Sequence, residues 1–482
     1  MPTDDRGGSA PGRRRFLRSM GLSAGAALFS GLEALGAQEQ PPATPARGGS
    51  RMRSRPDLLD AQSAPGIEVI QLTTETDVPS SHLYMEAQVF TPDSKRFVLH
   101  RSATAHGGSR HDPEHQYLLC DLEQDGALSP LTTETGVTAA SVSPDGRWVY
   151  YFVDETEIAG GRLTLKRVRL DGTARETIQV VDTPLLGTEF RPSCLYPLST
   201  ISSDGRRIAL SAFLGDGNTA NAPWGLMVFD IEQATVALLI HGRSWCNMHP
   251  QYCRSTDPEE SHDLLIQENH GNENDARGNN TLLVGGAGAD IHVIRDDGAG
   301  PWTTVPGPDP VEDSRLLGPA AQFRDMPWGR DGNEACQGHQ CWRGRSTWAV
   351  TSTGTNRPPE AQLIEGRAAP QAGHLGIATP GGVRNDLSRE FPDPHFYHFG
   401  TDLEGRRLVS DAGPLSTEAS IWAAEFGEPG RDPLRNFRYL LQPRSTCRSE
   451  AHIHPFLSPD GTLAFFNSDE SGLLQAYMIR GL

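Results

Sequence analysis

Two histidines close to the C-terminus are the residues best placed for chemistry. His452 and His454 are separated by a single residue and are followed by the turn sequence Ser-Pro-Asp-Gly at 458–461. Residues i and i+2 of a β-strand point to the same face, so both imidazoles can be directed at one point. Neutral imidazole is a frequent ligand of transition metals. The spacing therefore predicts half of a metal site, which side chains from elsewhere in the chain must complete.

Similar turn sequences recur through the chain and indicate the elements that position this pair. They lie roughly 50–60 residues apart, at 91–94, 143–146, 202–205, 255–258, 402–405 and 458–461. The one double-length gap leaves room for a further repeat around 342–352. A turn rich in Asp and Gly between strands is typical of a hairpin, and a repeat of this length is typical of a propeller. We therefore expect an all-β chain with a seven-bladed β-propeller over residues 61–482. A row of β-sandwiches is disfavoured because the repeats have no linkers between them.

The N-terminal segment has the pattern of an export signal. Arg13-Arg14-Arg15-Phe16-Leu17 is a twin-arginine motif, and Gly36-Ala37-Gln38 offers a cleavage site after an apolar stretch at 20–35. That stretch is too short to span a bilayer. We expect a Tat-type signal peptide at 1–37, a disordered linker at 38–60, and a periplasmic or secreted protein. The Tat export machinery would be a transient partner, without stable membrane insertion.

Further histidines lie close to the repeated turns. They are His82, His249, His270, His339 and His374. Because one end of a propeller channel is the usual position of a site, histidines at equivalent places in successive blades predict a shared site on the axis.

Four of the seven cysteines bracket two of these histidines. Cys246 and Cys253 flank His249, and Cys336 and Cys341 flank His339. In an exported protein such pairs favour short-loop disulfides. Zinc binding by these cysteines is the alternative, although no Cys-x-x-Cys doublet supports it.

These motifs together resemble a known family. The segments that carry the resemblance are Ser81-His82-Leu83-Tyr84, His270 to Arg277, His339 with Trp342, His374, and His452-Ile453-His454-Pro455. From about Val69 to Tyr477 the chain resembles the oligogalacturonate lyases, seven-bladed propeller enzymes that cleave short pectin fragments by β-elimination.

The resemblance implies roles for particular residues. It implies a divalent metal, usually manganese, on His374, His452 and His454, with His339 as the Brønsted base and Arg277 assisting it. The family has a further ligand, a glutamine three residues before the histidine pair. Here that position is Ser449, followed by Glu450, so the chain departs from the family in its coordination sphere.

The residue types suit this chemistry. β-Elimination at a uronate removes the weakly acidic C5 proton while the C4 oxygen leaves. A cation on the carboxylate stabilises the charge that develops, and three imidazoles leave coordination positions open for substrate. A neutral histidine can accept the proton near neutral pH, and an arginine can bind the carboxylate through two hydrogen bonds. We expect additional substrate contacts from His82, His249, His270, Arg343 and Arg345.

Two other functions stay open. One is a lyase for another uronic polysaccharide such as ulvan, and the other is a non-catalytic propeller of the TolB type. The formal net charge of −18 argues against nucleic acid as a partner. That charge repels an anionic uronate oligosaccharide at long range, but salt screens it within about 10 Å, so local cations decide binding.

Overall fold

The computed structural model describes residues 52–482, except for 107–111, 113, 158–160, 283–288, 306–314, 325–335, 354–362, 365–366, 369–373 and 429–431. The predicted signal peptide at 1–37 and most of the predicted linker lie outside the described residues. Among the described residues, no helix is long and apolar enough to cross a membrane.

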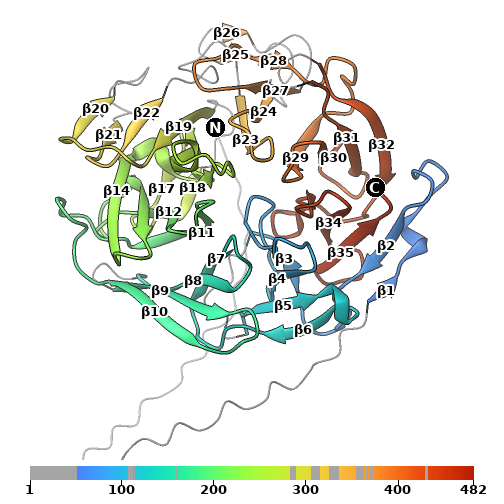
Figure 1. The fold of residues 1–482 in the computed structure, drawn as a ribbon, viewed down its shortest axis with the longest axis horizontal. Helices are drawn as coiled ribbons and strands as arrows, with labels where there is room; N and C mark the ends of the chain where they lie inside the picture. The colour runs from blue at the N-terminus through green and yellow to red at the C-terminus, as the bar shows by residue number, and fades with distance from the viewer. Residues whose placement is uncertain are drawn as a thin grey trace, which may run out of the picture. The chain divides into compact units, whose positions relative to one another are not determined.

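The chain is all-β and forms seven antiparallel blades in a ring, as expected (Figure 1). Each blade runs outward from the strand nearest the axis. Blade 1 consists of β3 (Ser81–His82), β4 (Arg96–His100), β5 (Tyr117–Asp121) and β6 (Ala127–Pro130). Blade 2 consists of β7 (Val137–Val142), β8 (Trp148–Glu155), β9 (Arg162–Arg169) and β10 (Arg175–Val181). Blade 3 consists of β11 (Cys194–Ile201), β12 (Arg207–Phe213), β13 (Trp224–Asp230) and β14 (Thr235–Gly242), with β21 (Arg315–Leu317) and β20 (Thr303–Val305) added at its outer edge.

The remaining blades repeat this order. Blade 4 consists of β15 (Gln251–Tyr252), β16 (Asp263–Asn269), β19 (Ala289–Arg295) and β22 (Gln322–Arg324), and blade 5 of β23 (Cys336–Trp342), β24 (Ala349–Thr353), β27 (Leu375–Ala378) and β28 (Asn385–Asp386). Blade 6 consists of β29 (Phe396–Thr401), β30 (Arg407–Ala412), β31 (Ser420–Glu425) and β32 (Arg435–Leu441). Blade 7 contains β33 (Phe456–Leu457), β34 (Leu463–Ser468) and β35 (Gln475–Arg480). Two small hairpins are β17 (Glu273–Asn274) with β18 (Asn280–Leu282), and β25 (Leu363–Ile364) with β26 (Arg367–Ala368). The short 3-10 turns are η1 (Pro56–Leu58), η2 (Leu122–Gln124), η3 (Arg243–Trp245), η4 (Glu260–His262) and η6 (Ser449–Ala451).

The N-terminal strands close the ring by completing blade 7. β2 (Glu68–Gln71) pairs with β35, and β1 (Arg53–Ser54) pairs with β2. The buried Arg55 guanidinium lies 2.6 Å from a Glu470 carboxylate oxygen of the same blade. Residues 52–60, predicted as part of a disordered linker, are therefore a structural part of the propeller, because strand pairing and this ion pair hold them there.

The repeated turn has a physical basis that explains its sequence. In blade 2 the Ser143 hydroxyl donates to the Asp145 carboxylate at 2.6 Å, and that carboxylate accepts the Arg147 N–H at 3.1 Å. Gly146 has φ +68°, a left-handed conformation that glycine adopts without strain. The Ser143 N–H closes the hairpin on the Trp148 carbonyl at 2.8 Å.

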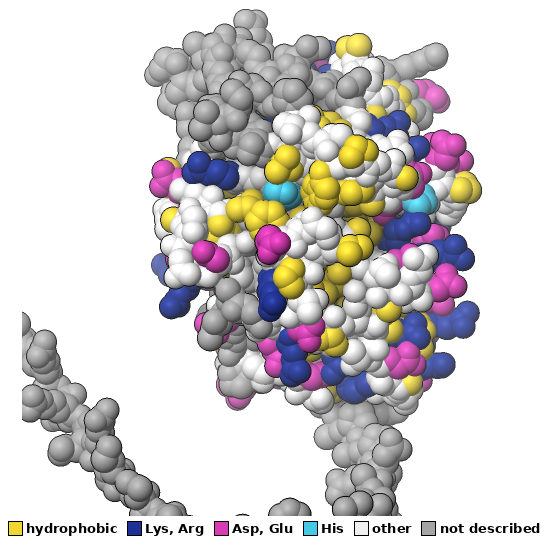
Figure 2. Space-filling view, turned by 90° about the vertical axis from the view of Figure 1, so that its left-hand side faces the viewer, with side chains coloured by type: hydrophobic (Ala, Val, Ile, Leu, Met, Phe, Trp, Pro, Cys, Tyr) yellow, Lys and Arg dark blue, Asp and Glu magenta, His cyan; other side chains and the backbone are white. Residues whose placement is uncertain are grey.

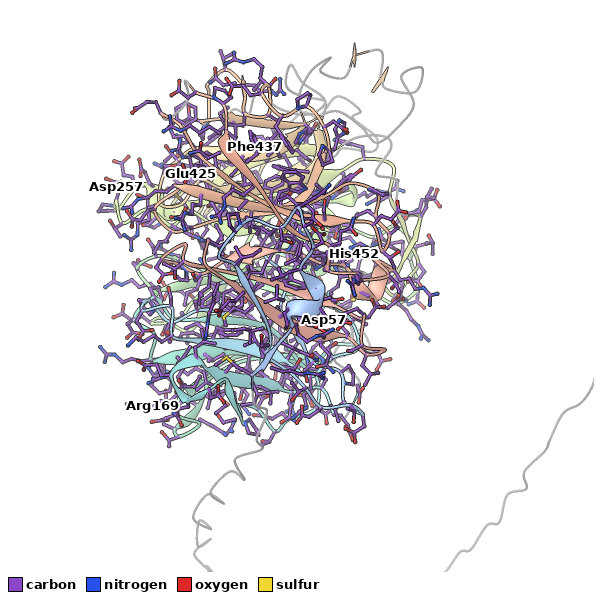
Figure 3. All side chains as sticks on the ribbon, turned by 90° about the vertical axis from the view of Figure 1, so that its right-hand side faces the viewer. Asp57, Arg169, Asp257, Glu425, Phe437 and His452 are labelled. Atoms are coloured by element: carbon purple, nitrogen blue, oxygen red, sulfur yellow. The ribbon has the colours of Figure 1, made fainter. Side chains whose placement is uncertain are left out.

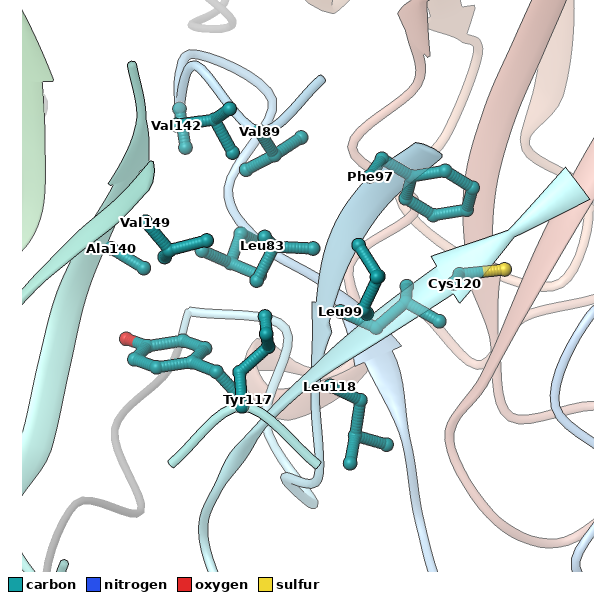
Figure 4. Packing of buried hydrophobic residues seen from close by; sticks show 14 of the residues in the cluster. Leu83, Val89, Phe97, Leu99, Tyr117, Leu118, Cys120, Ala140, Val142 and Val149 are labelled. Atoms are coloured by element: carbon teal, nitrogen blue, oxygen red, sulfur yellow. The ribbon is translucent and has the colours of Figure 1, made fainter. Parts of the chain in front are cut away.

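Apolar side chains fill the space between neighbouring blades. Figure 4 shows Leu83, Leu99 and Tyr117 of blade 1 facing Ala140 and Val149 of blade 2. Because the inner strands are covered on both faces, strands such as β8 and β12 are buried along nearly their whole length rather than on alternate residues. Figure 2 shows basic and acidic side chains interspersed over the lower part of one side, with hydrophobic ones gathered above them.

Candidate metal centre

A histidine occupies the same position in the innermost segment of four successive blades. In each of these blades, the backbone N–H of one residue closes the hairpin between the first two strands, and the histidine lies four residues before that residue. The histidines and their closing residues are His249 and Cys253, His339 and Arg343, His398 and Asp402, and His454 and Ser458. The equivalent residues of blades 1 to 3 are Ala87, Ala139 and Leu198. The imidazoles therefore come from one half of the ring.

A bulge at this position directs these side chains. His249 and His454 have φ angles of 49° and 45°, as does Ala139 at 51°, and the register shifts across His339 and His398. Bulges re-aim side chains and are common next to active sites. The spacing of His452 and His454 predicted a regular strand, but β33 begins only at Phe456. The left-handed backbone at His454, rather than the alternation of a strand, brings the His452 and His454 rings together, with their centroids 5.2 Å apart.

The histidines form a cluster around His454, which we call the axial histidine cluster: His106, His339, His398, His452 and His454. The centroid of the His454 ring lies 4.6 Å from that of His398 and 4.6 Å from that of His106. The His339 and His398 rings are 4.7 Å apart. One potential ligand atom from each of His106, His452 and His454 lies within 4.8 Å of the other two.

Four buried ring nitrogens of this cluster, from His339, His452 and His454, lack hydrogen-bond partners within the described part of the chain. His454 is fully buried, and neither its Nδ1 nor its Nε2 has a hydrogen-bond partner there; the same holds for Nδ1 of His452 and of His339. Burial lowers the pKa of His454 well below its ordinary value, and His398 and His106 lower it further. Burial likewise lowers the pKa of His452 to about 4. These imidazoles are neutral at pH 7 and keep a lone pair, as a metal ligand requires, so the donor set fits a divalent metal.

An aspartate orients the third imidazole. His398 Nδ1 lies 2.8 Å from Asp411 Oδ2, and the His398 N–H donates to Oδ1 of the same carboxylate at 2.8 Å. In a neutral ring this contact places the proton on Nδ1, so that Nε2 would be the atom that binds a metal. A carboxylate behind a ligating histidine is the usual second layer of a metal site.

His106 reaches the cluster from the loop that follows β4. The Ala105 N–H donates to the Glu450 carbonyl at 2.8 Å, and Ala105 packs against Ala451. These contacts dock the loop on η6, the segment that contains Ser449. The side chain of Ser449 itself lies outside what the structure describes. The histidine thus stands beside the position at which the resemblance implied a glutamine.

A second polar group adjoins the cluster. His249 Nδ1 lies 3.0 Å from Glu86 Oε2, and the Tyr196 hydroxyl lies 2.9 Å from His249 Nε2. Burial raises the pKa of Glu86, although His249 opposes the shift. The Tyr84 ring connects the two groups, since its centroid lies 5.0 Å from that of His249 and 4.5 Å from that of His454.

His374, expected as a metal ligand, lies elsewhere in its blade. Its Nε2 lies 2.8 Å from the Phe391 carbonyl, and its Nδ1 accepts the Phe396 N–H at 3.1 Å. With both ring nitrogens engaged by the backbone, His374 has no lone pair to offer in this arrangement. His398, which the sequence analysis did not single out, lies beside the pair instead. Its offset from the turn at Asp402 was the signal that could have identified it.

Two other predicted histidines are buried away from the cluster. His82 packs among Phe97, Phe456 and Phe465, and burial lowers its pKa to about 3. His270 Nε2 lies 3.1 Å from Asp290 Oδ2.

Glu268, His270 and Asp290 form a second group with metal-ligand spacing. However, the buried Arg315 guanidinium forms an ion pair with Glu268, and His292 Nε2 lies 3.1 Å from the same carboxylate. The Arg315 guanidinium, which also lies 3.7 Å from Asp290, therefore already compensates the carboxylates of this group.

The predicted arginines lie outside the axial histidine cluster. Arg277 is exposed in the β17–β18 hairpin, and its N–H donates to Asp275 at 2.8 Å. Arg343 donates to the Gly405 carbonyl at 2.9 Å, and Arg345 pairs with Glu404 at 3.0 Å, so both link neighbouring blade turns.

The blade turns lie at the opposite end of the propeller from the histidine pair. In the side view of Figure 3, His452 and Asp257, a residue of the blade 4 turn, lie toward opposite ends. Arg343 and Arg345 belong to the equivalent turn of blade 5, so they are not at the histidine end.

The expected disulfides are not formed by the described cysteines. Cys246, Cys253 and Cys341 all carry free thiols. The side chain of Cys336 lies outside what the structure describes.

Fold and site together define a seven-bladed β-propeller with histidines converging at one end of its axis. No family model and no curated protein matches the chain. Among solved structures it is similar to an oligogalacturonate lyase in complex with manganese, at a TM-score of 0.61 and 16% identity, over 91% of this chain and 98% of that one. It is also similar to an oligogalacturonate lyase from Vibrio parahaemolyticus, at a TM-score of 0.59 and 15% identity over the same shares. At these identities the likeness establishes the fold.

Proposed function

We propose that this protein is a metal-dependent lyase that cleaves uronate-containing oligosaccharides by β-elimination. The observation that carries the proposal is the buried His454, whose two ring nitrogens have no partner among the described residues and whose ring lies between those of His106 and His398. A buried polar group without a partner costs about 1–3 kcal/mol, and a bound metal would remove that penalty. The likeness in fold to oligogalacturonate lyases supports the choice of reaction.

The metal would be held by His398, His452 and His454, with His106 as a fourth ligand. When bound, a divalent cation neutralises the substrate carboxylate and stabilises the charge that develops beside it. Manganese is the metal that the resemblance implies. Four nitrogen donors also suit later first-row metals such as zinc, because imidazole is a softer ligand than an amide oxygen.

The chain itself would supply the base and the substrate contacts. His339 is partly exposed beside His398, and burial and the neighbouring histidines lower its pKa well below the ordinary value, which keeps the ring neutral at pH 7. In that state it can accept the C5 proton. His249, fixed by Glu86, and Arg277 stay as candidates for binding the oligosaccharide. We further propose export through the Tat pathway, from the twin-arginine motif.

The test is absorbance of the 4,5-unsaturated uronate product with digalacturonate and trigalacturonate, using protein stripped with EDTA and reloaded with manganese or zinc. We expect product only with metal, and none with His339→Ala. His395→Gln is the matched control, since His395 is exposed and stacks on His374 rather than on the axial histidine cluster.

Product from another uronic polymer alone, such as ulvan, would keep the mechanism and change the substrate. If no uronate substrate gives product and the purified protein binds no metal, the proposal is refuted, and a binding propeller of the TolB type is left.

A further inference from the structure

A cavity of about 200 Å³ opens at the end of the axis opposite the histidine pair. Turn residues from all seven blades contribute to its wall: Pro92, Pro144, Ser203, Thr256, Arg345, Leu403 and Pro459. No histidine is among its lining residues. The cavity is therefore distinct from the candidate metal centre, and its use does not depend on the proposed function.

The wall is largely apolar. Phe90, Trp342, Phe399 and Phe456 line it, among other hydrophobic residues. The amide of Gln88, also at the wall, is engaged with the backbone of Ile201, donating to its carbonyl at 2.9 Å and accepting its N–H at 2.6 Å. A mostly apolar cavity with few polar groups is typical of a small-molecule site.

One cation in this wall, Arg254, has no counter-ion among the residues that the structure describes. Within the described residues, the Arg254 side chain makes no hydrogen bond and has no carboxylate within ion-pair distance. Burial lowers the pKa of Arg254 below its ordinary value, so the surroundings disfavour its charge. The neighbouring charged residues of the cavity are already paired, Arg345 with Glu404 at 3.0 Å and Glu86 with His249 at 3.0 Å. An anion is the ligand that would compensate Arg254.

We propose that this cavity binds a small organic monocarboxylate with an apolar body, its carboxylate on Arg254 and its body against the aromatic wall. Arginine and carboxylate match in geometry and form two parallel hydrogen bonds. The volume is appropriate, because a cavity of about 150 Å³ holds benzene. Benzoate is therefore the probe, and the neutral benzamide of nearly the same shape is its matched partner.

The experiment is a ligand-observed NMR titration of the purified protein with each probe. We expect benzoate to bind at least tenfold more tightly than benzamide. Arg254→Gln should remove that preference, and Arg254→Lys should keep part of it because the charge remains. Arg147→Gln is the control: it removes the same charge from an exposed arginine in the blade 2 turn that does not line the cavity. Thermal unfolding verifies that each variant is folded.

Equal binding of benzoate and benzamide to the wild-type protein would overturn the proposal, and this comparison needs no variant. No binding of benzoate at 10 mM, or unchanged binding to a folded Arg254→Gln variant, would overturn it as well.

Discussion

Replacing His454 by leucine should raise stability without metal and remove the stabilisation that metal gives. His454 leaves two ring nitrogens buried without a partner in the described chain, and each such group costs about 1–3 kcal/mol. Leucine has a similar volume and no polar atom, so His454→Leu removes this penalty. The left-handed backbone at φ 45° opposes the gain by about 1 kcal/mol, because histidine tolerates it better than leucine. We expect the variant in EDTA to be more stable than the wild type by about 1–5 kcal/mol.

Metal should act against that gain. At a metal concentration one hundred times the dissociation constant, the wild-type protein gains about 2.7 kcal/mol of stability, and a variant that binds no metal gains none. Thermal unfolding of the wild-type protein and of His454→Leu, in EDTA and in excess manganese or zinc, measures which of the two is more stable in each condition. His82→Leu is the control, because His82 is also buried but its Nε2–H donates to the Tyr477 carbonyl at 3.0 Å, away from the cluster. It should keep the full metal-induced shift.

Two results would refute this reasoning. A His454→Leu variant that is less stable than the wild type in EDTA by more than about 2 kcal/mol would make His454 a packing residue. A variant that keeps the metal-induced shift would place the metal elsewhere.

Three further predictions concern the surroundings of the site. Asp411→Asn should weaken metal binding about 10- to 100-fold while His398 remains present, measured by competition with a chelating dye. His106→Gln supplies an amide oxygen and should shift the ratio of manganese to zinc affinity toward manganese; an unchanged ratio would exclude His106 as a ligand. Burial alone would raise the pKa of Glu268, but its hydrogen bond with His292 and its ion pair with Arg315 hold that pKa at about 2, below the ordinary 4.5. The stability from Glu268 is therefore present above pH 4.5 and lost as the pH falls toward 2, so Glu268→Gln should destabilise the protein by about 3–5 kcal/mol at pH 7 and flatten acid unfolding over that window. A variant with an unchanged acid limb would contradict that account.

Much of the fold could be predicted because its signals are local. A serine hydroxyl, an aspartate and a glycine make the repeated turn within a few residues, as Ser143, Asp145 and Gly146 do. The number of blades follows from counting such turns, including the weak one before Trp348. The propeller begins before the expected boundary at residue 61. Arg53 and Arg55 carry no local pattern: Arg53 pairs with Gln71 of β2, and Arg55 pairs with Glu470 of blade 7, more than 400 residues later.

The candidate site also contains residues that local sequence signals identify and residues that only tertiary contacts identify. His452 and His454 could be found from their spacing, and His339 from its place before a turn. His398 and His374 are about equally plain in sequence, and the distinction between them depends on the backbone groups at Phe391 and Phe396 that engage both nitrogens of His374.

The sequence by itself determined the repeat, its turns and the histidine pair, because each depends on residues that are neighbours in the chain. Only the tertiary structure decided which imidazoles meet. His106 and His454 are separated by almost the whole ring, yet closure of blade 7 and the Ala105–Glu450 hydrogen bond bring their rings to 4.6 Å. The same closure leaves Arg254 facing a cavity made by seven turns, none of which forms a pocket alone. Side chains from different blades meet on the axis only when the ring closes, so no local pattern of residues predicts which of them meet.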